Sequence, residues 1–417
     1  MNFEQKLENY ANLLISHGIN VQPGQVVNIT SEICHRELVQ KMVRAAYRCG
    51  AKFVHVDFVD PILARLRVEE SHSEEFLRYV PPYTTAKYDH FVDDNAAVIR
   101  LVGSEDPHIL ADLPAKKVND LQTYFRQCLK RYYAEGIGKS KVQWTVAAAS
   151  TPAWGQLVFP ELPPQAAHEA LWEAIFKICH VDQPNYLGIW DKHQKSLIQK
   201  AKDLTNLQIK ELHFTGPGTD LRVGLSPQAV FKGGGDSTPQ GVAFEANIPT
   251  EECFTTPDYR RTEGRVRVTR PVSVNGKLIK GLEVEFKQGE IVNFSAEEGY
   301  DQFAAYIESD KGAKRLGEVA LVGIDSPIYQ SQRLFGEILF DENAACHIAV
   351  GFAYRFCIDG GSAMTAEELE AIGCNDSHVH TDFMISSENV DVKATTYDGK
   401  ELLIISQGRW NNPNFRL

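Results

Sequence analysis

Hydrophobic residues in the first half of the chain recur with two different periods. A spacing of three or four predicts helices over residues 3–14, 38–46, 113–135 and 167–179. Short apolar or alternating runs predict strands over residues 25–29, 53–59, 96–102 and 141–148. Strands that alternate with helices indicate a parallel or mixed sheet with helices packed on its faces.

The pattern changes after residues 180–188, where Pro184 and Gly188 interrupt the helical spacing. Helices are predicted over residues 190–204, 300–311 and 365–372, and short strands over 209–214, 220–225, 264–269, 277–287 and 290–296. The pairs Asn275-Gly276 and Asp398-Gly399 are typical of hairpin turns. We therefore predict an α/β scaffold domain over residues 1–183. A catalytic α+β domain with a largely antiparallel sheet is predicted over 184–417.

Composition narrows the class of protein. The chain has 417 residues, of which 43% are hydrophobic and 24% charged, as in an ordinary globular protein. Its formal net charge of −12 argues against a nucleic-acid or membrane partner, because both need a basic surface. The eight cysteines include no C-x-x-C pair, and the first residues do not resemble a signal peptide. A cytoplasmic location is expected.

The first half of the chain contains no recognisable nucleotide-binding or metal-binding motif. It contains neither a G-x-G-x-x-G motif nor a phosphate-binding G-x-x-x-x-G-K-[ST] motif, so no nucleotide site is predicted. Its histidines are scattered without the spacing of metal ligands. This half is therefore interpreted as scaffold.

The richest chemistry lies in the run Asn375–Ile385, which places two imidazoles and two carboxylates within eight residues. If the run is extended, His378, His380 and Asp382 project from one face of a strand. Such ligands suit a borderline divalent cation such as zinc, cobalt or manganese. The alternative is a half-buried strand in which the histidines are incidental.

Further acids and one histidine occur in three upstream elements. A loop between prolines, residues 247–257, carries Glu251 and Glu252, and Glu318 opens an apolar run. Glu342 and His347 flank the sequence Asn-Ala-Ala-Cys. Taken singly, each acid can be a capping or solvated residue. Together they imply desolvated groups that need a partner or a metal.

The number of charges in this set favours two metal ions over one. Glu252, Glu318, Glu342 and Asp382 carry about four negative charges, and the histidines at 347 and 380 are neutral donors. One divalent cation would leave like charges repelling in a partly buried pocket. Two would neutralise the set, as in two-metal aminopeptidase sites.

These four elements, in this order, resemble the aminopeptidase T/aminopeptidase S family of metallopeptidases, in particular its bacterial aminopeptidase S branch. The motifs are N-x-P-T-E-E-x-F-T-x-P, G-E-V-A-L-V, H-x-A-x-G-x-A-Y and N-x-S-x-x-H-x-D. The resemblance covers the whole chain and implies a cytoplasmic, homodimeric exopeptidase that acts on peptides with a free amino terminus. It implies two divalent ions (zinc, cobalt, manganese or magnesium), held by Glu252, Glu318, Glu342, His347, His380 and Asp382.

The same resemblance selects His380 over His378 and Glu252 over Glu251, and it places Tyr354 beside the metals. A two-metal site makes hydroxide available near neutral pH for attack on the scissile carbonyl. The Tyr354 hydroxyl is expected to stabilise the resulting oxyanion. Glu251 is a candidate for proton transfer to the leaving amine, the alternative being an exposed charge at the loop rim.

Two alternative functions stay open at this point. A metal-dependent carboxypeptidase or deacylase would cleave another amide, but a pocket for a terminal carboxylate should offer Arg or Lys, whereas the local excess is acidic. A non-catalytic binding protein would use the ions as structural staples.

Overall fold

The computed structural model describes residues 1–274 and 277–411, which divide into two compact units. Unit 1 comprises Met1–Trp190 and Gly235–Pro249. Unit 2 comprises Asp191–Gly234 and the chain from Thr250 onwards. The chain therefore passes from the first unit to the second more than once, and the last passage comes directly before Glu251 and Glu252.

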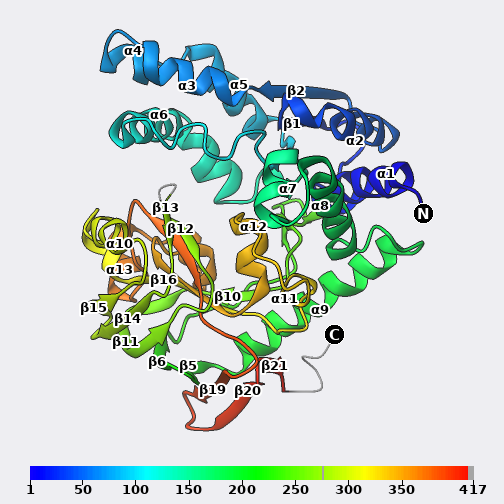
Figure 1. Ribbon diagram of the computed structural model, residues 1–417. Coiled ribbons are helices and arrows are strands. Elements are labelled where there is room, and N and C mark those ends of the chain that lie inside the picture. Colours follow the sequence, from blue (N-terminus) through cyan, green and yellow to red (C-terminus); the bar gives the residue numbers. More distant parts are fainter. Residues whose placement is uncertain (275–276, 412–417) are drawn as a thin grey trace. The chain divides into compact units, whose positions relative to one another are not determined.

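Unit 1 is an α/β structure, as predicted (Figure 1). Its main sheet has the order β2-β1-β3-β4-β9, and all of its pairs are parallel. The strands are β1 (Val26–Glu32), β2 (Phe53–Val59), β3 (Ala97–Val102), β4 (Gln143–Ala148) and β9 (Asn247–Ile248). The helices are α1 (Phe3–Leu13), α2 (Arg36–Arg48), α3 (Pro61–Glu70), α4 (Glu74–Arg78), α5 (Pro82–Asp93), α6 (Ala115–Cys128), α7 (Pro152–Val158) and α8 (Pro164–Ile178). A two-stranded ribbon joins β7 (Asp236–Ser237) to β8 (Ala243–Phe244).

The long helix predicted over residues 113–135 is shorter in the structure. Helix α6 ends at Cys128, because the backbone of Leu129 leaves the helical region with φ −94° and ψ 21°. A separate π-helical turn, Tyr132–Ile137, follows. The apolar spacing continues through the interruption, which is why the sequence pattern did not reveal it.

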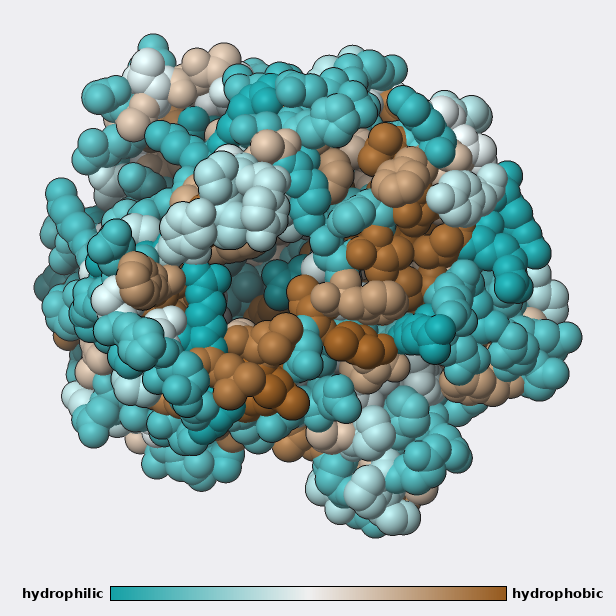
Figure 2. Space-filling view, turned by 90° about the horizontal axis from the view of Figure 1, so that it is seen from above, coloured by the Kyte–Doolittle hydropathy of each residue, from teal (hydrophilic) through white to brown (hydrophobic). Residues whose placement is uncertain are grey.

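The surface of the protein carries exposed apolar side chains. On β2 and α3 they include Phe53, Phe58, Ile62 and Leu63, and Figure 2 shows such groups as brown patches among hydrophilic residues. No helix among the described residues is long and apolar enough to cross a membrane.

Unit 2 contains a large and a small antiparallel sheet. The large sheet, of order β15-β14-β11-β6-β5-β19-β20-β21, is formed by β5 (Ile209–Gly216), β6 (Thr219–Leu225), β11 (Pro257–Arg267), β14 (Glu283–Lys287), β15 (Glu290–Ser295), β19 (Asp391–Thr396), β20 (Glu401–Ser406) and β21 (Arg409–Trp410). The small sheet, of order β10-β16-β17-β18, is formed by β10 (Cys253–Thr255), β16 (Leu316–Leu321), β17 (His347–Gly351) and β18 (His380–Met384). Further strands and α-helices of unit 2 are β12 (Val272–Val274), β13 (Lys277–Ile279), α10 (Tyr300–Ile307), α11 (Pro327–Gln330), α12 (Ile338–Asp341) and α13 (Ala366–Ala371). Helix α9 (Tyr186–Asn206) begins in unit 1 and continues into unit 2 at Asp191.

One of the two hairpins predicted in unit 2 is present in the structure, and the other cannot be compared with it. Asp398-Gly399 does connect the antiparallel pair β19–β20, whereas Asn275-Gly276 lies outside the described residues. The single strand predicted over 277–287 is wrong: it divides into β13 and β14. Gly281 lies between them with φ +59°, a left-handed conformation that ends an extended run.

Candidate metal centre

The small sheet of unit 2 has an apolar face and a face that carries the candidate ligands, because side chains alternate along its strands. Val319, Ile348 and Phe383 lie in the hydrophobic core of unit 2. Their neighbours along each strand point to the opposite face, because side chains alternate in a strand. The opposite face therefore carries Glu318 on β16 and Asp382 on β18.

Strand register brings the candidate ligands into adjacent rows on that face. Glu318 and Asp382 are both paired with Ala349 of β17, one on each side of it. His347 is paired with Ala320, and His380 with Gly351. Small side chains at the positions between the ligands leave room above the sheet, so ligands from three strands converge on one space.

Two groups of three potential ligands share Glu318. One is Glu252, Glu318 and His347, and the other is Glu318, His380 and Asp382. Oε1 of Glu318 lies 3.5 Å from Nε2 of His347, and Oε2 lies 3.7 Å from Nε2 of His380. One carboxylate thus faces two imidazoles, which is the arrangement expected of a ligand that bridges two cations.

The orientation of both histidines supports cation binding. Nδ1 of His380 lies 2.7 Å from the carbonyl oxygen of Phe352, and Nδ1 of His347 lies 3.2 Å from that of Ala345. A carbonyl only accepts, so Nδ1 carries a proton in each ring, and Nε2 faces the carboxylates with a lone pair when the ring is neutral or with a second proton when it is charged. A lone pair facing a carboxylate is repulsive unless a cation or a proton lies between them.

The carbonyl group of Phe352, which accepts the hydrogen bond from His380, packs closely against Gly317. A Cβ atom at Gly317 would lie 2.1 Å from the carbonyl oxygen of Phe352, the group that accepts from His380. The pairing of β16 with β17 shifts register at this point. Only glycine allows this close approach, so the residue before Glu318 helps to orient a ligand on another strand.

Glu252 and Glu342 complete the acidic set. Oε2 of Glu252 is buried 3.1 Å from Nε2 of His347 without the alignment of a hydrogen bond. Glu342 is half-buried at the start of a 3₁₀ turn, Glu342–Ala344, and lies outside both groups of three. Its oxygen Oε1 is 3.4 Å from the side-chain nitrogen of Asn343. A buried carboxylate oxygen that accepts no hydrogen bond fits a metal ligand.

Burial and the closeness of like charges shift the pKa values of the acids and histidines in the cluster. Burial raises the pKa of Glu318 to about 7, with repulsion from Asp382 and Glu252 adding to the shift. Burial and the charges of Glu252 and Asp382 also raise the pKa of Glu342 well above its usual value. Burial lowers the pKa of His380, but Asp382 and Glu318 outweigh it and raise the value to about 9. The site therefore attracts positive charge.

Tyr354 packs against His380 at the edge of the cluster. Its ring centroid is 5.2 Å from that of His380, and the ring stacks on Phe356 at 5.1 Å. Burial and then the charges of Glu318, Asp382, Glu342 and Glu252 raise the pKa of its hydroxyl well above the usual value. The hydroxyl therefore stays protonated near neutral pH.

Glu251 is buried, so the alternative of an exposed charge at the loop rim is wrong. Its carboxylate lies in neither group of three ligands. Oε1 is 3.8 Å from Nε2 of His193, on helix α9. Burial raises the pKa of Glu251 to about 8, while Lys200 of the same helix opposes the rise.

Sequence reasoning missed the importance of His193 and Lys200. Both are buried on α9, on the stripe that also carries the buried residues Trp190, Leu197 and Leu204. Two polar residues within an otherwise apolar helical stripe are a signal that the sequence already contained.

The expectation that His378, His380 and Asp382 share one strand face is wrong for His378. Strand β18 begins at His380, and His378 is exposed before it. The backbone N–H of His378 donates to Oδ2 of Asp310 at 2.7 Å, which holds this residue in a bend. Of the two histidines, only His380 lies with Glu318 and Asp382.

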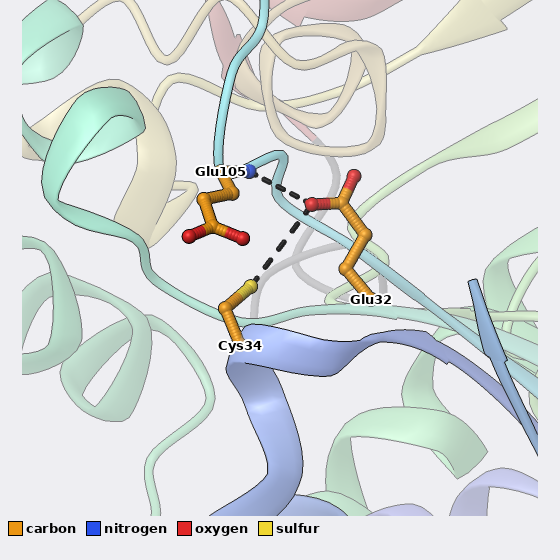
Figure 3. Close-up of side chains that lie close together, drawn as sticks. All are labelled: Glu32, Cys34 and Glu105. Atoms are coloured by element: carbon orange, nitrogen blue, oxygen red, sulfur yellow. Dashed lines mark hydrogen bonds between the residues drawn. The ribbon is translucent and has the colours of Figure 1, made fainter. Parts of the chain in front are cut away.

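A third group of possible ligands lies in unit 1, where Glu32, Cys34 and Glu105 approach one another (Figure 3). Oε2 of Glu32 accepts from the backbone N–H of Glu105 at 2.8 Å and from the thiol of Cys34 at 4.0 Å. Cys34 and Glu105 are exposed, and the group has no histidine. Exposed acids are solvated and their own contacts account for the cluster, so we assign it no function.

Comparison with known proteins decides the family. The family model described as thermophilic metalloprotease (M29) matches residues 3–410. The chain belongs to the M29 family of metalloproteases. It is 37% identical to aminopeptidase 2 of Geobacillus stearothermophilus and 38% identical to aminopeptidase AmpS of Bacillus subtilis (strain 168). These matches cover 98% of this chain, and 98% and 99% of the two relatives.

A solved structure agrees with this membership. Wild-type AmpT from Thermus thermophilus superposes with a TM-score of 0.91 and 37% sequence identity, covering 99% of this chain and 100% of that chain. An α/β unit with a parallel sheet, followed by antiparallel sheets that hold buried Glu and His, is thus the AmpT fold.

The two histidines near the end of this M29 chain give a direct test of ligand assignment. We expect His380→Ala to lose bound metal, because Nε2 of His380 faces both Glu318 and Asp382. His378→Ala is the matched control and should keep its metal and most of its activity. Elemental analysis of both purified variants decides, and metal loss from His378→Ala alone would overturn the assignment.

Proposed function

We propose that this metal-dependent aminopeptidase of the M29 family holds two divalent cations in unit 2. Glu252, Glu318 and His347 would bind one ion, and Glu318, His380 and Asp382 the other. Glu342 would complete the set, since burial and neighbouring acids leave its charge in need of a cation. The observation that carries the proposal is that the two oxygens of Glu318 face two different histidines.

The ions, when bound, supply hydroxide near neutral pH and polarise the scissile carbonyl. Zinc, cobalt, manganese and magnesium are candidates, and the nitrogen ligands favour the first three over magnesium. Tyr354 would donate its hydroxyl to the developing oxyanion, because burial and then the neighbouring acids raise the pKa of this group and keep it protonated. The carbonyls of Phe352 and Ala345 would hold the imidazoles in place throughout.

The chemistry of the cluster also suits an amino-terminal substrate. Two bound cations would balance the charges of Glu252, Glu318, Glu342 and Asp382, and the neutral amine of the substrate would then be a ligand for one of them. A carboxypeptidase would instead need a cation to hold the terminal carboxylate. None of the six candidate ligands is a Lys or Arg that could hold a terminal carboxylate, which favours release of the amino-terminal residue over a carboxypeptidase reaction.

Substrates that differ only at the amino group test this proposal. A leucyl peptide with a free amine should be cleaved, and its acetylated counterpart should react at least about tenfold more slowly, since acetylation removes the charge and the metal-binding nitrogen. The assay uses protein stripped by a chelator, with each metal added back separately. Metal-independent turnover, or efficient cleavage of the acetylated peptide, would contradict the proposal. If the protein binds metal but shows no turnover, the alternative of a non-catalytic binding protein, in which the ions only stabilise the fold, would be favoured.

Location and assembly belong to the same proposal. All eight cysteines are free thiols, five of them buried, which suits a reducing cytoplasm. A homodimer is expected from the family resemblance and is tested by light scattering of the purified protein.

A further inference from the structure

Strand β2 is an open edge of the parallel sheet in unit 1 (Figure 1). Among the described residues it pairs only with β1, from Phe53 to Val59 and without a shift of register. Natural edge strands are usually blunted by Lys, Pro or a bulge, because their free N–H and C=O groups can pair with another chain. The seven residues of β2 include neither Lys nor Pro. The edge is therefore able to accept a further strand.

The sequence of β2 is close to a palindrome, since it reads Phe-Val-His-Val-Asp-Phe-Val. If a second β2 paired with it antiparallel and centred on Val56, then Val56 would lie opposite itself and His55 opposite Asp57 of the second copy. Every other position would pair Phe with Val. Nε2 of His55 lies 3.0 Å from Oδ1 of Asp57 within one copy, so these two side chains already share a face. Apolar pairs and pairs of opposite charge stabilise antiparallel strands.

A groove with a volume of about 540 Å³ runs along the same edge, between α2 and β2, and is lined by Arg36, Val39, Gln40, Val43, Arg44, Val56 and Phe58. Helix α2 contacts both β1 and β2, so it covers the two outermost strands. Two copies joined at β2 would place their α2 helices about two strand spacings, or about 10 Å, apart. Packed helices lie about 8–10 Å apart. The groove is therefore the space that the α2 side chains of a second copy would fill.

The charges of α2 suit two antiparallel helices. Glu37 lies in the first turn of α2 and Arg44 in its second half, and both residues are exposed. A twofold axis through the joined strands makes the two α2 helices antiparallel, so that Glu37 of each copy would lie beside Arg44 of the other. Complementary charges of this kind fix the register of an interface.

Large apolar side chains are exposed at both ends of β2. Phe53, at its start, is 53% exposed, and Val59, at its end, is 46% exposed. Ile62 and Leu63, at the start of α3, are 52% and 63% exposed. In an antiparallel pair the end of one β2 lies beside the start of the other, so these groups would cover each other. A cluster of exposed apolar side chains of this size is typical of an interaction surface.

We propose that β2 and α2 form the interface of a homodimer, in which two copies of this chain pair through antiparallel β2 strands centred on Val56. The inference rests on the homodimer expected above and names its surface. Five strands from each copy form one continuous sheet, with the two α2 helices packed on it. The N–H of Val54 donates to the hydroxyl of Tyr47 at 3.3 Å in one copy, and a carbonyl oxygen of the second strand replaces this acceptor.

Sedimentation velocity of the full-length protein over a series of concentrations tests the surface. The wild type should sediment as a dimer. Val56→Lys should raise the dissociation constant of the dimer at least about a hundredfold, because the twofold axis sets two like charges opposite each other in a desolvated contact. The matched control is Val292→Lys, at an exposed valine of β15, which is an edge strand of the large sheet in unit 2. This control should stay dimeric.

Cysteine cross-linking tests the register and does not depend on the folding of Val56→Lys. On oxidation Val56→Cys should give a disulfide-linked dimer, because residues paired across the axis have Cα atoms about 4.5–5.5 Å apart. In Val54→Cys the two new thiols would be four residues apart along the strands, about 13 Å, which is too far for a disulfide. The wild type gives the background from its exposed Cys34 and Cys128. Cross-linking of Val56→Cys that does not exceed that of Val54→Cys or the wild type would overturn the inference.

The remaining outcomes separate this surface from other assemblies. A dimer that withstands Val56→Lys, or that dissociates in Val292→Lys, has its interface elsewhere, which overturns this inference and leaves the homodimer standing. A monomeric wild type overturns both. If that monomer binds the acetylated peptide Glu-Val-Glu-Val-Glu and Val56→Lys does not, the edge serves an acidic segment of another protein. None of these results bears on the metal centre, which is tested by turnover and metal content.

Discussion

Glu318→Gln is expected to reduce turnover to the background of the assay while the protein stays folded. The two oxygens of Glu318 face two histidines, and an amide offers only one oxygen and no charge. Its NH₂ group would point at one Nε2 and displace a cation from that side. If the centre holds two ions as proposed, bound metal should fall from two ions to at most one, as measured by elemental analysis of the variant after equilibration with excess metal.

Folding of the Glu318 variant has to be verified separately. Gln keeps the shape of the side chain and removes a crowded buried charge, so the melting temperature of the metal-free protein should not fall. A matched control is Glu367→Gln, an exposed acid of α13 in the same unit. Normal turnover and normal metal content in Glu318→Gln would show that Glu318 does not bridge two ions.

Tyr354→Phe is expected to lower kcat by about ten- to a thousandfold, the range for one lost oxyanion donor. KM should change little, because the lost hydrogen bond is stronger in the transition state than in the ground state. The ring should keep its place, since its contacts with Phe356, Phe352 and His380 do not involve the hydroxyl. Steady-state kinetics of the fully metallated variant measure both constants.

Tyr306, a buried tyrosine of unit 2, provides the control for Tyr354. The hydroxyl of Tyr306 is 2.8 Å from Oγ1 of Thr381, between the ligand positions of β18. Tyr306→Phe removes a buried hydroxyl close to the site without removing the donor near the acids. A loss of kcat in Tyr306→Phe equal to that in Tyr354→Phe would indicate disturbed packing rather than oxyanion stabilisation. Full activity of Tyr354→Phe would show that the hydroxyl takes no part in the reaction.

The sequence predicted those parts of the fold that local patterns encode. Alternating strands and helices identified the parallel sheet of unit 1, and short strands identified the antiparallel sheets of unit 2. The strand break at Gly281 and the end of α6 were not predicted, because apolar spacing continues across both. The spacing of apolar residues predicts whether a segment is helical or extended, but it does not reveal the single residue at which the backbone conformation changes.

The candidate site was predictable as a set of residues but not as a geometry. The order of the motifs singled out Glu252, Glu318 and His380, yet spacing alone did not distinguish His380 from His378. That distinction arises because His378 precedes β18 and its N–H is bound by Asp310, a residue distant in sequence. The surroundings of Glu251 likewise depend on α9, which lies more than forty residues earlier in the chain. The spacing of residues within one segment does not predict contacts between segments that are distant in the sequence.

The ligands of the small sheet also determine when the site can first exist during biosynthesis. Glu252 precedes β10, and His380 and Asp382 arrive only with β18, close to the carboxyl end of the chain. Synthesis proceeds from the amino end, so a growing chain has the group Glu252, Glu318 and His347 before β18 emerges, but it lacks the group Glu318, His380 and Asp382 until β18 has paired with β17. The second proposed cation site can therefore be completed only after β18 has paired with β17, and a chain truncated before β18 should bind at most one of the two proposed ions.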